Sequence, residues 1–189
     1  MAHPALEELV ARFQAARQSG DIARPSEEQL RLHRELAEAC PAFTQNVLFL
    51  AWLLQRRLWT APGDDQEPEP TFAEVQRLLE QAVLGSYRSA PALVELGFFL
   101  DTYRDSAHEA AKLYEEAAVK ASGTLKDAWW GLIRYWNAER TKETLEKALR
   151  LGELAEKMFP DSHALIEELM TTRQYAAQEG LLVPEPEQS

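Results

Sequence analysis

Apolar residues recur along this chain mostly at spacings of three and four, which is the period of a helix with one buried side. No segment of four or more residues combines strict polar and apolar alternation with the β-branched enrichment that is typical of a strand. The pattern therefore predicts an all-α protein. Helices are expected over residues 4–18, 26–40, 42–59, 71–85, 90–103, 106–121, 125–138, 141–159 and 161–179.

Residues that start or stop helices lie between these segments. Ser26 and Gln29 have the spacing of a capping box, which predicts a helix start at this point. Pro41 separates the second helix from the third, because proline lacks the amide hydrogen that a continuing helix needs. Asp161, directly after Pro160, is the expected N-cap of the last helix.

The longest irregular insert is TAPGDDQEPEPT, residues 60–71. It contains four acidic residues, three prolines and no basic residue, so a solvated, mobile loop is expected. The end of the chain, VPEPEQS, has a similar composition. We therefore expect one helical domain over residues 1–180, with the acidic insert inside it, and a flexible tail over residues 181–189.

Small and apolar residues repeat at a nearly constant offset. Val75, Leu79 and Ala82 recur 35 residues later as Ala110, Tyr114 and Ala117, and the two alanines recur again 38 residues later as Ala148 and Ala155. Small residues on one helical face allow close helix packing, and a period near this value is typical of stacked helix hairpins. The expected architecture is a short α-solenoid of about four antiparallel hairpins, closed by the helix at 161–179.

Over residues 90–160 the chain resembles the tetratricopeptide repeat family and the related SEL-like repeats. The residues that match the repeat pattern are Leu93, Leu96, Gly97, Leu100, Ala110, Tyr114 and Ala117, followed in the next unit by Trp129, Leu132, Trp136, Ala148, Ala155 and Pro160. Two positions depart from it, because Ile133 stands where the family prefers glycine and Gly152 where it prefers an aromatic residue or leucine. The resemblance implies a helical scaffold that binds other proteins.

Three tryptophans fall within DAWWGLIRYWNAER, residues 127–140. Trp129, Leu132, Ile133 and Trp136 have the spacing of one helical face, and we expect this face to belong to the core.

Trp130, Arg134 and Asn137 have the same spacing one position further around the helix. The resemblance implies that first-helix residues at these positions line a concave groove, with Phe98 and Asp101 as their counterparts one unit earlier. An aromatic ring beside a guanidinium and an amide is suited to peptide binding. Two alternatives stay open: Trp130 packs under the last helix, and Arg134 extends into solvent.

The chain carries 20 basic and 31 acidic residues, which gives a formal net charge of −11. This excess argues against nucleic acid or an anionic membrane as partner and leaves a basic protein partner open. The longest apolar run, residues 47–54, is too short to span a bilayer and indicates a helix buried on several sides. With no visible signal peptide and one cysteine, Cys40, a cytoplasmic location is expected.

The sequence contains no catalytic, cofactor-binding or metal-binding motif that we recognise. HEAAK, residues 108–112, lacks the second histidine of the zinc-protease motif, and phosphate-binding glycine loops are absent. We therefore expect no enzyme activity, no metal and no cofactor.

The leading hypothesis is a non-catalytic protein–protein interaction module for a peptide or a folded protein partner. One alternative is an immunity protein, inhibitor or secretion chaperone that neutralises a specific client. Another is a structural subunit that forms homo-oligomers.

Overall fold

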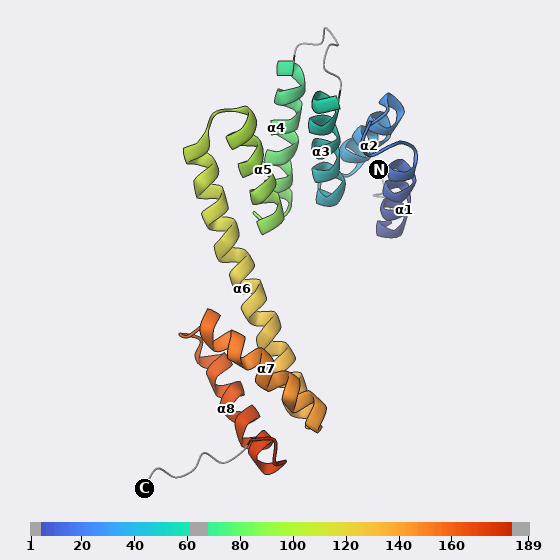
Figure 1. The fold of residues 1–189 in the computed structure, drawn as a ribbon. Helices are drawn as coiled ribbons and strands as arrows, with labels where there is room; N and C mark the ends of the chain where they lie inside the picture. The colour runs from blue at the N-terminus through green and yellow to red at the C-terminus, as the bar shows by residue number, and fades with distance from the viewer. Residues whose placement is uncertain (1–4, 61–67, 183–189) are drawn as a thin grey trace. The chain divides into compact units, whose positions relative to one another are not determined.

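The computed structural model describes residues 5–60 and 68–182, and the regular structure in these two ranges is entirely helical (Figure 1). The predicted all-α class is confirmed. The helices are α1 (Leu6–Gln18), α2 (Glu27–Ala39), α3 (Thr44–Thr60), α4 (Pro68–Gly85), α5 (Ala90–Tyr103), α6 (Ala107–Glu139), α7 (Lys142–Met158) and α8 (His163–Gln178).

The chain divides into two compact units, residues 1–120 and residues 121–189. The first unit contains α1 to α5 and the first part of α6. The second contains the rest of α6 together with α7 and α8. The single domain expected over 1–180 stays a prediction, and most of the acidic insert at 60–71 and of the tail at 181–189 lies outside the described residues.

Two of the predicted helix boundaries between α1 and α4 agree with the structure and one does not. The Ser26 hydroxyl accepts a hydrogen bond from the Gln29 amide at 3.1 Å, and the chain leaves the helical path around Pro41, as predicted. Helix α4 begins three residues earlier than predicted, because proline is tolerated in the first turn of a helix. Glu69, assigned to the insert by the sequence, lies on α4 and forms an ion pair with Arg104 at 2.7 Å.

In the first unit α1 contacts α2, α2 contacts α3, α3 contacts α4 and α4 contacts α5. Of the residues whose repetition predicted stacked hairpins, five are buried together in one hydrophobic cluster: Val75, Leu79, Ala82, Ala110 and Ala117. Ala148 and Ala155 are buried in the core of the second unit, and Tyr114 is 36% exposed. The small and aliphatic members of the repeat therefore lie at helix contacts.

Gly97 shows why a small residue is needed at one of these contacts. A Cβ atom at this position would lie 3.0 Å from the Cε1 atom of Tyr114, so the tyrosine ring fills the space that a side chain would need. The ring therefore lies directly against the backbone of α5, which brings α5 and α6 close together.

The second unit has a smaller core of Ile133, Ala148, Ala155, Leu165 and Leu169. Gly152 departs from the repeat pattern, and the space beside it is filled by another residue. The Leu169 side chain lies where a Cβ atom of residue 152 would be. Leu165, Leu169 and Thr172 form a buried stripe on the last helix, as expected for a helix that covers the preceding hairpin.

The predicted break between helices at 106–121 and 125–138 is wrong. Helix α6 runs without interruption through Ser122, Gly123 and Thr124. One glycine lowers helix stability by about 1 kcal/mol, which does not stop a helix flanked by good helix formers such as Lys120, Ala121 and Leu125.

Two further expectations in the second unit need correction. Leu132 is 44% exposed, because the buried face of α6 is centred on Ile133, with Trp129 and Trp136 packed beside it. The N-cap of α8 is Ser162 rather than Asp161. The assignment of Trp129 and Trp136 to the core is confirmed.

The continuous helix can be tested at Gly123, where an added Cβ atom meets no other atom within 4 Å. We expect Gly123→Ala to raise the free energy of unfolding by about 0.5–1 kcal/mol, because alanine favours the helix. Urea unfolding followed by circular dichroism measures this. Gly152→Ala is the opposite control and should destabilise the protein, because Leu169 would have to move. Destabilisation by Gly123→Ala would indicate a turn at this point.

Candidate functional site

A hollow of about 330 Å³ opens on the first unit between α1, α3 and α5. We call it the α1–α3–α5 hollow. It is lined by Phe13 and Arg17 from α1, by Gln45, Leu48, Phe49 and Trp52 from α3, and by Pro91 and Glu95 from α5. In Figure 1, α3 lies between the α1–α2 pair and the α4–α5 pair, and α3 supplies half of the lining residues.

The helical period of α3 explains this arrangement. Gln45, Leu48, Phe49 and Trp52 are spaced as one helical face, which faces the hollow. The opposite side of the helix carries Val47, Leu50 and Leu54, which are buried in the core of the unit. The apolar run at 47–54 is therefore a helix buried on several sides, as predicted, with one side left for the hollow.

Aromatic rings form much of the surface of the hollow. Phe49 stacks on Trp52 with ring centroids 5.8 Å apart, and Phe13 makes an edge contact with Phe49 at 5.6 Å. Trp52 is 36% exposed, so its ring is accessible to a partner. The Arg17 guanidinium carbon lies 5.2 Å from the centre of the Phe49 ring, a cation–π distance.

Two charged side chains stand on different walls of the hollow, Arg17 on α1 and Glu95 on α5. Within the described ranges, neither charged group forms a hydrogen bond or ion pair with another side chain. Burial raises the pKa of the half-buried Glu95 carboxyl group above its ordinary value. The hollow therefore combines an apolar surface with one cation and one anion that lack counter-ions in the described structure.

His33 lies behind these rings and is fully buried. Its ring makes edge contacts with Phe13 and Phe49, at 5.7 Å and 5.0 Å between centroids. His33 Nδ1 lies 2.7 Å from Asn46 Oδ1, and Asn46 Nδ2 donates to the His33 carbonyl at 2.9 Å. Burial, and secondarily the charge of Arg17, lower the pKa of His33 although the Asn46 hydrogen bond opposes this.

Two of the predicted binding residues, Phe98 and Asp101, lie on α5 in the first unit. Both are exposed, and the Phe98 ring makes an edge contact with Tyr103 at 6.5 Å. The pKa of the Tyr114 hydroxyl is raised by burial and by the carboxylates of Asp101 and Glu95. The negative charges of Asp101 and Glu95 therefore both influence the Tyr114 hydroxyl.

The other three predicted residues, Trp130, Arg134 and Asn137, lie in the second unit. The Arg134 guanidinium stacks over the Trp130 ring at 5.2 Å, and Trp130 packs against the core of Ile133, Leu165 and Leu169. Asn137 is buried: its amide nitrogen donates to the Glu168 carbonyl at 3.0 Å, and its oxygen accepts from the Thr172 hydroxyl at 2.9 Å. The binding role of these residues stays a prediction.

Sequence reasoning did not single out Arg17, Phe49, Trp52 or Glu95. The spacing of aromatic and polar residues on α3 was a signal for an additional exposed face, but nothing in the sequence connects that face to α1 and α5.

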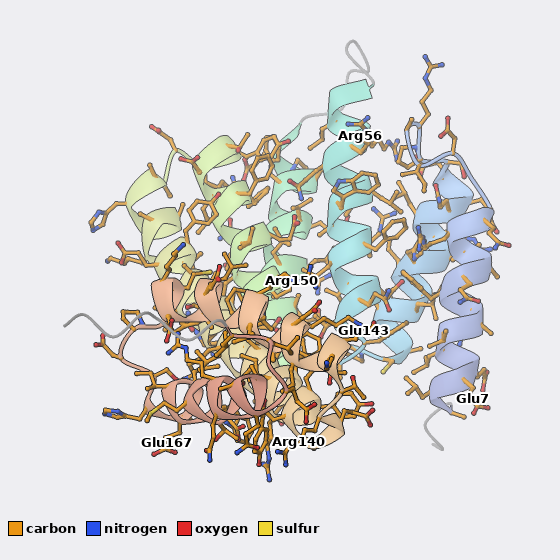
Figure 2. The ribbon with its side chains drawn as sticks, turned by 60° about the horizontal axis from the view of Figure 1, so that its bottom comes forward. Glu7, Arg56, Arg140, Glu143, Arg150 and Glu167 are labelled. Atoms are coloured by element: carbon orange, nitrogen blue, oxygen red, sulfur yellow. The ribbon has the colours of Figure 1, made fainter. Side chains whose placement is uncertain are left out.

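Outside the hollow, the described surface carries many charged and polar side chains, with single exposed apolar residues such as Leu84 and Val119 among them. Figure 2 labels Glu7 and Arg56 in the first unit and Arg140, Glu143, Arg150 and Glu167 in the second, all on solvent-exposed positions. No group of three or more His, Cys, Asp or Glu residues in the described ranges is placed to hold a metal ion. None of the described helices combines the length and apolar character needed to cross a membrane.

Comparison with known proteins finds similarity to a repeat family and to an uncharacterized protein. A family model described as the Myxococcota tetratricopeptide repeat protein family matches residues 1–87, the part that contains α1 to α4. A protein of Myxococcus xanthus, described as an uncharacterized 18.1 kDa protein in the carS 3′ region, is 34% identical over 137 residues. These residues cover 72% of this chain and 76% of the Myxococcus protein.

From the lowered pKa of His33 we predict that the stability of the protein depends on pH. Because the folded state holds its pKa below the ordinary value of 6.5, the unfolded chain binds a proton that the folded chain excludes. Stability should therefore fall as the pH drops below that value, by at most about 1.4 kcal/mol per pH unit from this one group. Urea unfolding between about pH 7.5 and about pH 5.5 measures the slope.

The matched variant is His33→Gln, whose amide can still donate to Asn46 but does not titrate. Subtracting its pH dependence from that of the wild type removes the contribution of the other titrating groups. Equal slopes for the two proteins would contradict the assignment to His33.

From the hydrogen bonds of Asn137 we predict that replacing this residue destabilises the protein. Asn137→Ala removes the hydrogen bonds to Glu168 and Thr172 and should cost about 1–3 kcal/mol of unfolding free energy, because buried polar groups lose partners. Arg134→Ala, at an exposed position, should cost less than about 1 kcal/mol. Tryptophan fluorescence during urea unfolding compares the two variants, and equal losses would argue against a structural role of Asn137.

Proposed function

The chain belongs to the Myxococcota tetratricopeptide repeat protein family, and we propose that it is a non-catalytic module that binds a peptide, or an exposed segment of a folded protein, in the α1–α3–α5 hollow. Repeats of this type typically offer concave surfaces to other proteins rather than catalytic groups. Phe98 and Asp101 extend the proposed site along α5.

The observation that carries the proposal is the accessible aromatic surface of Phe49 and Trp52. A tryptophan that is 36% exposed and stacked on a second ring offers apolar area that is already ordered. Binding therefore costs little side-chain entropy, which is the property of residues that dominate binding energy at protein interfaces.

The charge of the chain supports a basic partner. With a net charge of −11, a cationic protein would be attracted over long distances, and this attraction would weaken with salt. An immunity protein, an inhibitor or a secretion chaperone would be a particular form of the same activity.

Trp130 and Arg134 form a second proposed contact, on the second unit. Their stacked arrangement leaves Arg134 exposed while Trp130 is half-buried, and we propose that Asn137 supports them from below. We also propose a cytoplasmic location, which fits a chain with the single cysteine Cys40.

The experiment is selection of a phage-displayed random peptide library on the full-length protein, followed by affinity measurement with synthetic peptides. Trp52→Ala should weaken the selected peptides by about tenfold or more, the effect of truncating a central aromatic contact. The folded state of the variant is checked by circular dichroism.

Trp130→Ala is the comparison variant. Affinities that fall in Trp52→Ala and persist in Trp130→Ala would support the hollow. The reverse result would place binding on the second unit. A library that yields no peptide dependent on either tryptophan would contradict the proposed function.

A further inference from the structure

The α5 wall of the hollow carries one carboxylate, that of Glu95. Within the described ranges this carboxylate forms no side-chain hydrogen bond or ion pair. The carboxylate of Asp101, further along α5 and outside the lining of the hollow, adds negative charge near Tyr114. The nearest arginines in the sequence are already paired: Arg88 with Glu116, and Arg104 with Glu69. Arg17, on the α1 wall of the same hollow, is not paired with Glu95 either, so the Glu95 carboxylate is open to a cation from a partner.

The position of Glu95 makes a cation on the partner favourable for binding. The carboxylate is half-buried beside apolar surface, so water already stabilises its charge less well than at an open position. A neutral partner that covered the hollow would remove the remaining water and leave the charge without a counter-ion, which is costly. A partner with a suitably placed ammonium or guanidinium group avoids that cost.

The rest of the lining fixes where each part of the partner goes. Leu48, Phe49, Trp52 and Pro91 offer contact to an apolar side chain. Arg17 gives the α1 wall the opposite charge and repels a cation from that side. The two walls therefore impose a direction, with the basic group of the partner on α5.

We propose that the α1–α3–α5 hollow selects peptide segments in which an apolar side chain lies next to a lysine or arginine, with the apolar group against Phe49 and Trp52 and the cation on Glu95. This inference rests on the proposed function. It adds that Glu95 determines specificity, both by attracting basic segments and by penalising neutral or acidic ones.

The test uses the full-length protein and the peptides selected from the random library. Each selected peptide is synthesised in its original form and with its lysine or arginine replaced by glutamine, and affinities are measured by fluorescence anisotropy. With the wild-type protein, the glutamine form should bind about tenfold more weakly, the scale of a partly buried charge pair. The Glu95→Gln protein should bind the original peptide more weakly than the wild-type protein does, to a similar extent.

Combining the two changes tells a direct contact from a general effect of charge. If Glu95 contacts the basic residue, Glu95→Gln with the glutamine peptide should lose little more than either change alone. Glu38→Gln is the matched control, because it removes one carboxylate from an exposed position on α2 that does not line the hollow. It should change affinity by less than about twofold.

Two results would overturn the inference while leaving the proposed function intact. In the first, the selected peptides depend on Trp52 but contain no basic residue. In the second, the fold-changes in affinity caused by Glu95→Gln and by the peptide change multiply, as expected for two groups that do not interact. If no selected peptide depends on Trp52, the hollow is not the binding site and both proposals fail.

Discussion

The structure depends on the close approach of neighbouring helices at positions where one of them carries a small side chain. Gly97 admits the ring of Tyr114, and Gly152 admits the side chain of Leu169. Ala110 and Ala117 play the same part in the core of the first unit. Because an α-helix has a fixed period, these contacts determine which face of each helix is buried and which faces remain available.

The hollow is a consequence of that constraint. Helix α3 buries Val47, Leu50 and Leu54 against its neighbours and turns Phe49 and Trp52 to the other side. Phe49 serves both purposes, since it packs against the core and also lines the hollow. The buried His33 lies directly behind it, so the binding surface rests on the same packed layer that stabilises the unit.

Much of the fold could be predicted from the sequence, because helix periodicity, Ser26 and Pro41 act over short distances. The break expected at 122–124 was wrong because a repeat pattern indicates where a turn usually occurs, whereas local helix propensity decided the outcome here. The site could be predicted less well from the sequence. Phe13, Trp52 and Glu95 are far apart in the sequence and meet only through tertiary packing. The family match covers residues 1–87, whereas the resemblance in the sequence was placed over residues 90–160.

Helix α8 has a consequence for assembly. A stack of similar helix pairs presents, at each open end, a surface that resembles its own internal joints, and such a surface invites head-to-tail growth into filaments. Here Leu165 and Leu169 occupy the last joint, while Glu167, Arg173 and Gln174 face outward. Although Met170 is exposed among these polar residues, the outer side of α8 is mainly polar and offers a further molecule less apolar surface than the buried side does.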